Sequence, residues 1–123
     1  MNIDAFLDKR YHSSKYNCAA FVCEVWKVIA RQDISSALQG AMTGEASRVL
    51  HAHNLTVFKR LTVPHTPCLA LFQANRKAPH VGIWLDGKIL HITENGVNWI
   101  PLDVAMIGFN QVRFYDVEKS CNC

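Results

Sequence analysis

Two six-residue runs separated by Asp86-Gly87 constrain the fold of this chain more than any other feature. The runs are HVGIWL at 80–85 and KILHIT at 88–93, and both are rich in residues that strands favour. Asp-Gly is a preferred dipeptide for a two-residue hairpin turn, because such a turn needs positive φ at both positions. The sequence therefore predicts an antiparallel hairpin whose register is set by its turn.

The two faces of this hairpin differ in chemistry, because side chains alternate between faces along a strand. One face is wholly apolar and carries Val81, Ile83, Leu85, Leu90 and Ile92. On the other face, the register makes His80 and His91 diagonal neighbours and places Gly82 opposite His91. Diagonal side chains lie roughly 7–8 Å apart at the backbone. We expect the two imidazoles to hydrogen-bond, and such a pair is equally compatible with two purely structural histidines.

The remaining pattern divides the chain into a helical front half and a strand-rich back half. In the back half we expect strands at 56–61, 68–74, 97–100 and 111–117, a hairpin turn at Asn95-Gly96, and a short turn or helix at 102–108. In the front half we expect a short helix at 2–8, a strong helix at 18–31 and another from about Gly44 to His53. This order predicts an α+β fold, with N-terminal helices packed on a meandering antiparallel sheet.

The composition fits one globular domain spanning residues 1–123, since half of the residues are hydrophobic. The 13 basic and 10 acidic residues give a net charge of +3 and are scattered along the chain, which argues against a nucleic-acid interface. The N-terminal segment has no long apolar run, so we expect neither a signal peptide nor a transmembrane segment. The protein is therefore expected in the cytoplasm on synthesis.

Five cysteines form an odd set without a repeated metal-type spacing, so the sequence predicts no disulfide framework. Two of them are interpreted as buried structural residues, Cys23 and Cys68. A metal site at the terminal pair, Cys121 and Cys123, is not expected, because no histidines are nearby. A metal site at His51 and His53 is not expected either, because their side chains would diverge on a helix. No metal and no cofactor is expected.

Cys18 stands where a polar loop at 9–17 becomes the strong helix. The free N–H groups and positive dipole end of a helix start favour a thiolate, the reactive form of cysteine. The apolar stripe of the helix consists of Cys18, Val22, Val25 and Ile29, widened by Phe21 and Val28. A small buried residue without a chemical role is the alternative interpretation of Cys18. If Cys18 is reactive, it would form a triad with the histidine pair, in which Cys18 is the nucleophile, His80 the general base and His91 the orienting residue.

The segments YNCAAFVCEVW at 16–26 and APHVGIWLDGKILHITENGVNWIPL at 78–102 resemble the NlpC-type papain-like cysteine peptidases and amidases, bacterial cell-wall endopeptidases with phage relatives. TPCLALF at 66–72 resembles the proline-led apolar strand of that superfamily. In the family a Cys opens a helix, a His begins a His-Val-Gly strand, and a third polar residue, often His, lies on the next strand. The matching positions here are Cys18, His80 and His91.

The resemblance implies a papain-like NlpC-type fold and a thiol protease or amidase that hydrolyses an amide bond in a peptidoglycan stem peptide. It also implies a phage-tail or lysis protein, with tail or assembly proteins as partners and with virion association or delivery to the periplasm. Family members use a Tyr upstream of the Cys in the oxyanion hole. Here Tyr11 is the first candidate and Tyr16 the second, and Asn17 is a further oxyanion or substrate candidate, standing where relatives usually have an acidic residue.

Two alternatives remain open at the level of sequence. One is a thiol amidase or acyltransferase that acts on a small metabolite, peptide or lipid, because related folds serve those reactions. The other is a non-catalytic phage tail or assembly component that retains the fold as a scaffold. Digestion of purified wall fragments would separate the peptidase from the first alternative, and a wild-type-like phenotype for Cys18→Ala would favour the second.

Overall fold

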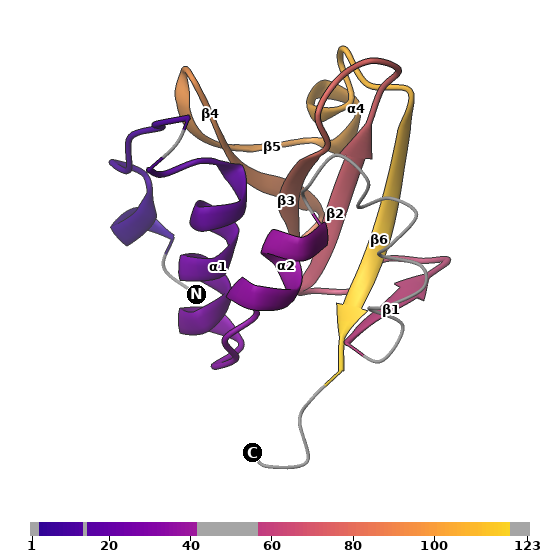
Figure 1. Ribbon diagram of the computed structural model, residues 1–123, viewed down its shortest axis with the longest axis horizontal. Coiled ribbons are helices and arrows are strands. Elements are labelled where there is room, and N and C mark those ends of the chain that lie inside the picture. Colours follow the sequence, from indigo (N-terminus) through magenta and orange to yellow (C-terminus); the bar gives the residue numbers. More distant parts are fainter. Residues whose placement is uncertain (1–2, 14, 42–56, 119–123) are drawn as a thin grey trace.

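The computed structural model of the chain describes residues 3–13, 15–41 and 57–118. Six strands form one sheet, in the order β1-β6-β2-β3-β4-β5, and every neighbouring pair is antiparallel (Figure 1). The strands are β1 (Phe58–Leu61), β2 (Cys68–Gln73), β3 (His80–Leu85), β4 (Lys88–Thr93), β5 (Gly96–Ile100) and β6 (Gln111–Val117). The described helices are the 3₁₀-helix η1 (Asp4–Phe6), α1 (Cys18–Ile29), α2 (Ser35–Ala41) and α4 (Leu102–Ala105). The α+β expectation is confirmed.

The predicted meander is correct for β2 to β5 and wrong for β6. This last strand returns across the sheet and lies between β1 and β2. The physical reason lies in β2, whose residues are buried from Cys68 to Phe72. A strand that is apolar on both faces is favoured in the interior of a sheet, with a neighbour on each side. Strand β2 therefore takes β3 on one side and β6 on the other.

Helix α1 begins and packs as the sequence predicts, with one exception. Asn17 is its N-cap, and the Asn17 side-chain oxygen accepts a hydrogen bond from the Ala20 N–H at 3.1 Å. The buried positions are Phe21, Val22, Val25 and Trp26. Placing Val28 in the apolar stripe was wrong, because Val28 is 60% exposed. The buried indole of Trp26 extends the stripe on the opposite flank instead.

Two predictions about the front half have different outcomes. The short helix expected at 2–8 is a single 3₁₀ turn, η1. The helix expected from about Gly44 to His53 lies outside the described residues. Helix α2 was not predicted. Its first residues, Ser35 and Ser36, are weak helix formers, and the Asp33 side chain accepts hydrogen bonds from Ser35 at the helix start.

The β3–β4 hairpin has the predicted register. Asp86 and Gly87 have φ values of 50° and 83°, and Leu85 pairs with Lys88 across the turn. In the next hairpin the expected turn at Asn95-Gly96 was wrong by one residue. Thr93 pairs with Gly96, so that Glu94 and Asn95 form the loop. The Asn95 N–H donates to the Thr93 hydroxyl at 3.1 Å, which stabilises this arrangement.

The sheet has one face covered by α1 and a second face on which α4 packs. All five apolar residues of the predicted inner face are buried in the core beneath α1, as expected: Val81, Ile83, Leu85, Leu90 and Ile92. A smaller apolar cluster on the second face contains Ala70, Phe72, Ile89 and Ala105. The start of α1 lies at the same end of the molecule as α4 and the loop before β3 (Figure 1). That end holds the candidate site.

Gly82 permits the close approach of β4 near His91. A Cβ at Gly82 would lie 3.0 Å from the Ile89 Cγ2 atom and 3.2 Å from the His91 Cβ atom. We predict that Gly82→Ala lowers the free energy of unfolding by about 1–2 kcal/mol, because the added methyl group overpacks this contact. Urea unfolding measures the change. Lys59→Ala, at an exposed position of the edge strand β1, is the control and should leave the stability nearly unchanged. An unchanged midpoint for Gly82→Ala would show that the approach tolerates a side chain.

Candidate active site

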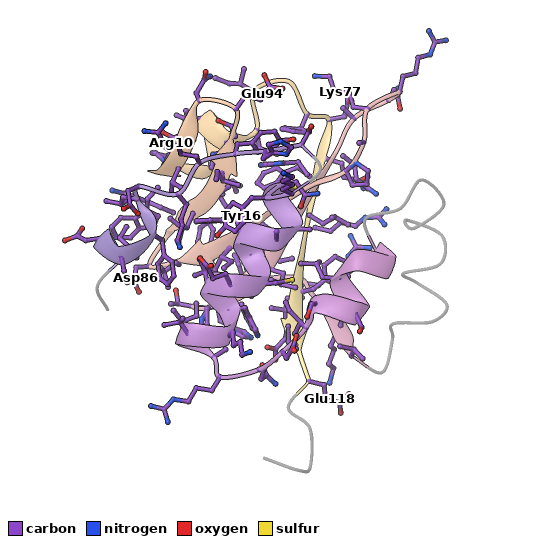
Figure 2. All side chains as sticks on the ribbon, turned by 60° about the vertical axis from the view of Figure 1, so that its left-hand side comes forward. Arg10, Tyr16, Lys77, Asp86, Glu94 and Glu118 are labelled. Carbon is purple, nitrogen blue, oxygen red and sulfur yellow. The ribbon has the colours of Figure 1, made fainter. Side chains whose placement is uncertain are left out.

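One pocket of about 460 Å³ contains the three residues of the expected triad, Cys18, His80 and His91. They come from different elements, since Cys18 is the first residue of α1, His80 the first of β3, and His91 lies within β4. Lys77 and Glu94 also line this pocket. Figure 2 shows both at the end of the molecule where α1 begins. The fold thus brings together residues that are far apart in the sequence.

Cys18 is partly buried, and its environment favours the neutral thiol. Burial raises the pKa of the Cys18 thiol above its ordinary value, while the backbone N–H groups of Val81, Ala19 and Cys18 itself act in the opposite direction. The N–H groups at the helix start favour the thiolate, as expected, but their effect is smaller than that of burial. Desolvation of the charged form outweighs the N–H groups at this position.

The two histidines are joined as the hairpin register predicts. The His80 Nε2 atom lies 2.8 Å from the His91 Nδ1 atom, a normal hydrogen-bond distance. The rings meet edge to face, with centroids 5.0 Å apart and an interplanar angle of 69°. Because His91 occupies one nitrogen of His80, the other nitrogen of His80, Nδ1, remains for a different partner.

Both histidines are expected to be neutral near pH 7. Burial, reinforced by the neighbouring His91, lowers the pKa of His80 to about 4. Burial also lowers the pKa of His91, which is only 5% exposed. Among the described residues, the His91 Nε2 atom has no hydrogen-bond partner. A neutral imidazole can accept a proton, so His80 has the protonation state that a general base requires.

The three oxyanion or substrate candidates lie in different places. Tyr11 lines the pocket together with Cys18. Tyr16 does not line it, and its hydroxyl donates to the Glu24 carboxylate at 2.8 Å. Asn17 is committed to capping α1. Of the three, Tyr11 is thus the one that the structure brings to the cysteine and the histidines.

Asn98 is a pocket residue that the sequence analysis missed. It lies on β5, directly opposite His91, and lines the same pocket. A turn at Asn95-Gly96 would have placed Ile100 opposite His91 and Asn98 opposite Thr93, so Asn98 was not identified as the direct neighbour of His91. Phe109, in the loop after α4, was also missed. Its position depends on how that loop folds back toward β3, which no local pattern indicates.

Among the described residues, the other cysteines and histidines do not line the pocket. Burial raises the pKa of both the Cys23 and Cys68 thiols to about 11, and Cys68 is fully buried. Across 3–13, 15–41 and 57–118, no group of three or more His, Cys, Asp or Glu side chains is arranged to hold a metal ion. The remaining residues considered for a metal site lie outside the described ranges: His51, His53, Cys121 and Cys123.

The low pKa of His80 predicts a loss of stability in mild acid. The folded state binds the proton at about pH 4, whereas an unfolded histidine binds it at about 6.5. As the pH falls from 6.5 to 4, the unfolded chain gains the proton first, so stability that is complete above pH 6.5 declines. At about 1.36 kcal/mol per pH unit, His80 accounts for a loss of about 3 kcal/mol.

Urea unfolding at pH 7 and at pH 4.5 tests this expectation. His80→Gln should reduce the difference between the two pH values, because glutamine does not titrate. His12→Gln, at an exposed histidine, is the matched control and should keep the wild-type difference. The same difference in wild type and His80→Gln would contradict a buried, neutral His80.

Comparison with protein-family models, with curated proteins and with solved structures found no match to this chain. Within the part of the chain that the structure describes, no helix has the length and apolar character needed to cross a bilayer.

Proposed function

We propose that the protein is a cysteine hydrolase with a papain-like NlpC-type fold, which cleaves an amide bond. Cys18 is the nucleophile, His80 the general base and His91 the residue that orients His80. The observation that carries this proposal is that a thiol at a helix start and a hydrogen-bonded histidine pair open on one pocket. A nucleophile, a base and an orienting partner are the parts that this reaction class needs.

The proposed proton path follows from the nitrogen that His91 occupies. In the reactive tautomer, His80 Nε2–H donates to His91 Nδ1, and the lone pair on His80 Nδ1 accepts the proton of the Cys18 thiol. The sulfur forms a bond to the amide carbonyl carbon. When the carbon–nitrogen bond breaks, the proton on His80 Nδ1 passes to the leaving amine. Water then hydrolyses the thioester with His80 as base, which releases a carboxylic acid and restores the thiol.

The same path assigns a proton to His91. If His91 Nδ1 accepts from His80, the neutral His91 ring carries its hydrogen on Nε2. That nitrogen is buried and lacks a partner among the described residues. Asn98 lies opposite His91 and is the nearest polar residue across the β4–β5 ladder. We assign His91 the role of fixing the orientation of His80, and Tyr11 that of an oxyanion donor at the pocket wall.

The substrate proposed is a peptidoglycan stem peptide, and the setting a phage tail or lysis protein that reaches the wall from a virion or after delivery to the periplasm. The resemblance of the segments around Cys18, His80 and His91 supports this substrate. A basic and an acidic side chain, Lys77 and Glu94, also line the pocket and suit a peptide that carries both charges.

A thiol amidase or acyltransferase for a substrate with an apolar group is the second candidate. It is favoured by the apolar wall that α4 and its following loop contribute, where Val104 and Ile107 are 45% and 77% exposed. Exposed aliphatic side chains at a pocket wall can bind an apolar group from water. A panel of wall peptides and N-acylated amides distinguishes the two substrate classes.

Substitutions at the triad test the proposed division of roles, with release of new amino groups from purified wall fragments as the assay. Cys18→Ala should abolish release, and the matched Cys23→Ala should retain it. His80→Ala should lower the rate by at least about a hundredfold, because proton transfer contributes roughly 10²–10⁴. His91→Ala should leave partial activity, lower by about tenfold. Full activity in Cys18→Ala would overturn the proposal.

Alkylation by iodoacetamide tests the neutral resting state without a substrate. Because burial raises the pKa of Cys18, its reaction at pH 7 should be slower than that of glutathione and should accelerate above pH 9. Peptide mass spectrometry measures the rate for each cysteine separately. His80→Gln should slow the reaction of Cys18 further and leave Cys23 unchanged. Rapid alkylation of Cys18 at pH 6 would indicate a thiolate–imidazolium pair and contradict the neutral one.

A further inference from the structure

Two phenylalanine rings pack against one side of the His80 imidazole. Phe109 lies nearly parallel to it, with centroids 5.7 Å apart and an interplanar angle of 14°. Phe72, from β2, contacts it at 5.8 Å and 42°. The two phenylalanines also touch each other, with centroids 5.4 Å apart. The three centroid distances are similar, so both phenylalanines lie on the same side of His80, while its Nε2 edge meets His91.

The loop that presents Phe109 is held by several hydrogen bonds. The Phe109 N–H donates to the Met106 carbonyl at 2.9 Å, and the Asn110 N–H donates to the Gln73 carbonyl at 2.9 Å. Lys77 donates to the Gly108 carbonyl at 3.1 Å, and its ammonium group lies 5.7 Å from the centre of the Phe109 ring. The ring is thus placed against His80 by a fixed backbone.

We propose that Phe109 is a positioning residue, whose stacked ring holds the His80 imidazole in the orientation that joins Nε2 to His91 and excludes water from that face. The inference rests on the proposed role of His80 as general base and deepens it. A single hydrogen bond at Nε2 holds one edge of the imidazole, whereas a stacked ring also restricts the tilt of the ring plane. His91 and Phe109 therefore fix different degrees of freedom of the same ring.

The ring of Phe109 also affects which form of His80 is stable. Apolar contact removes water from the imidazole and disfavours its charged form, in agreement with the low pKa of His80. The titratable and charged groups that share its pocket are His91 on β4, Cys18 on α1, Tyr11, Glu94 and Lys77. None of them lies between Phe109 and His80 in the described structure, where the rings stack directly.

Titration of His80 by NMR tests the proposal, with the Cε1–H resonance reporting protonation and the ring ¹⁵N shifts reporting the tautomer. Phe109→Leu keeps an apolar side chain and removes the planar face. We expect its His80 to bind a proton at least tenfold more tightly than in wild type, and to lose its preference for the Nε2–H tautomer. Phe109→Tyr retains the ring and should restore both wild-type values.

Phe114→Leu is the matched control, because Phe114 contacts Trp84 edge to face within the same apolar cluster, with centroids 5.6 Å apart. It should leave the His80 titration unchanged. If Phe109→Leu does not fold, Phe109→Met supplies a second ringless variant for the same measurement. The positioning role would be overturned if the ringless variant kept the wild-type proton affinity and tautomer of His80. It would also be overturned if Phe114→Leu changed them as much as Phe109→Leu does.

The outcomes also separate this inference from the proposed function. If Phe109→Leu shifts the His80 titration but the wild-type protein releases no amine from wall fragments or acylated amides, the positioning role stands and the hydrolase proposal is rejected. If the wild-type protein cleaves amides but Phe109→Leu leaves the His80 titration unchanged, the hydrolase proposal stands and the positioning role of Phe109 is rejected.

Discussion

The hydrogen bond between His80 and His91 is the interaction on which the candidate site depends. It joins two adjacent strands at a nitrogen–nitrogen distance of 2.8 Å. Its geometry follows from the Asp86-Gly87 turn, which sets the register, and from Gly82, which lets the backbone of one strand approach the side chain on the other. The opposite face of this hairpin is packed beneath α1. A slip of one residue in the register would therefore have two effects at once: it would expose core residues and it would separate the histidines.

Burial, more than charge, determines the electrostatics of the pocket. It disfavours the thiolate of Cys18 and the imidazolium of His80, so both groups are neutral at rest. The helix start and the nearby N–H groups do not overcome this effect before a substrate binds. A neutral pair can still react, since proton transfer from sulfur to nitrogen can accompany attack on the carbonyl. The apolar rings of Phe72 and Phe109 beside His80 contribute to this burial.

Local patterns predicted the features that depend on local chemistry. The Asp86-Gly87 hairpin and the α1 boundary at Cys18 follow from turn residues and periodicity. The insertion of β6 beside β2 was not predicted, because the apolar sequence of β2 indicates an interior strand but not which distant strand becomes its second neighbour. Asn98 was missed through a turn wrong by one residue, and Phe109 because a loop brings it to His80 from outside the hairpin.

Catalysis by this site requires the sulfur of Cys18 to approach the free nitrogen of His80. A crystal structure of the protein at pH 7 measures that separation directly, together with any solvent between the two atoms. We expect Sγ of Cys18 and Nδ1 of His80 to lie within about 4 Å, or to share one bridging water, with His80 Nε2 hydrogen-bonded to His91. A Cys18 sulfur directed into the core, with a side chain between it and the imidazole, would contradict this expectation.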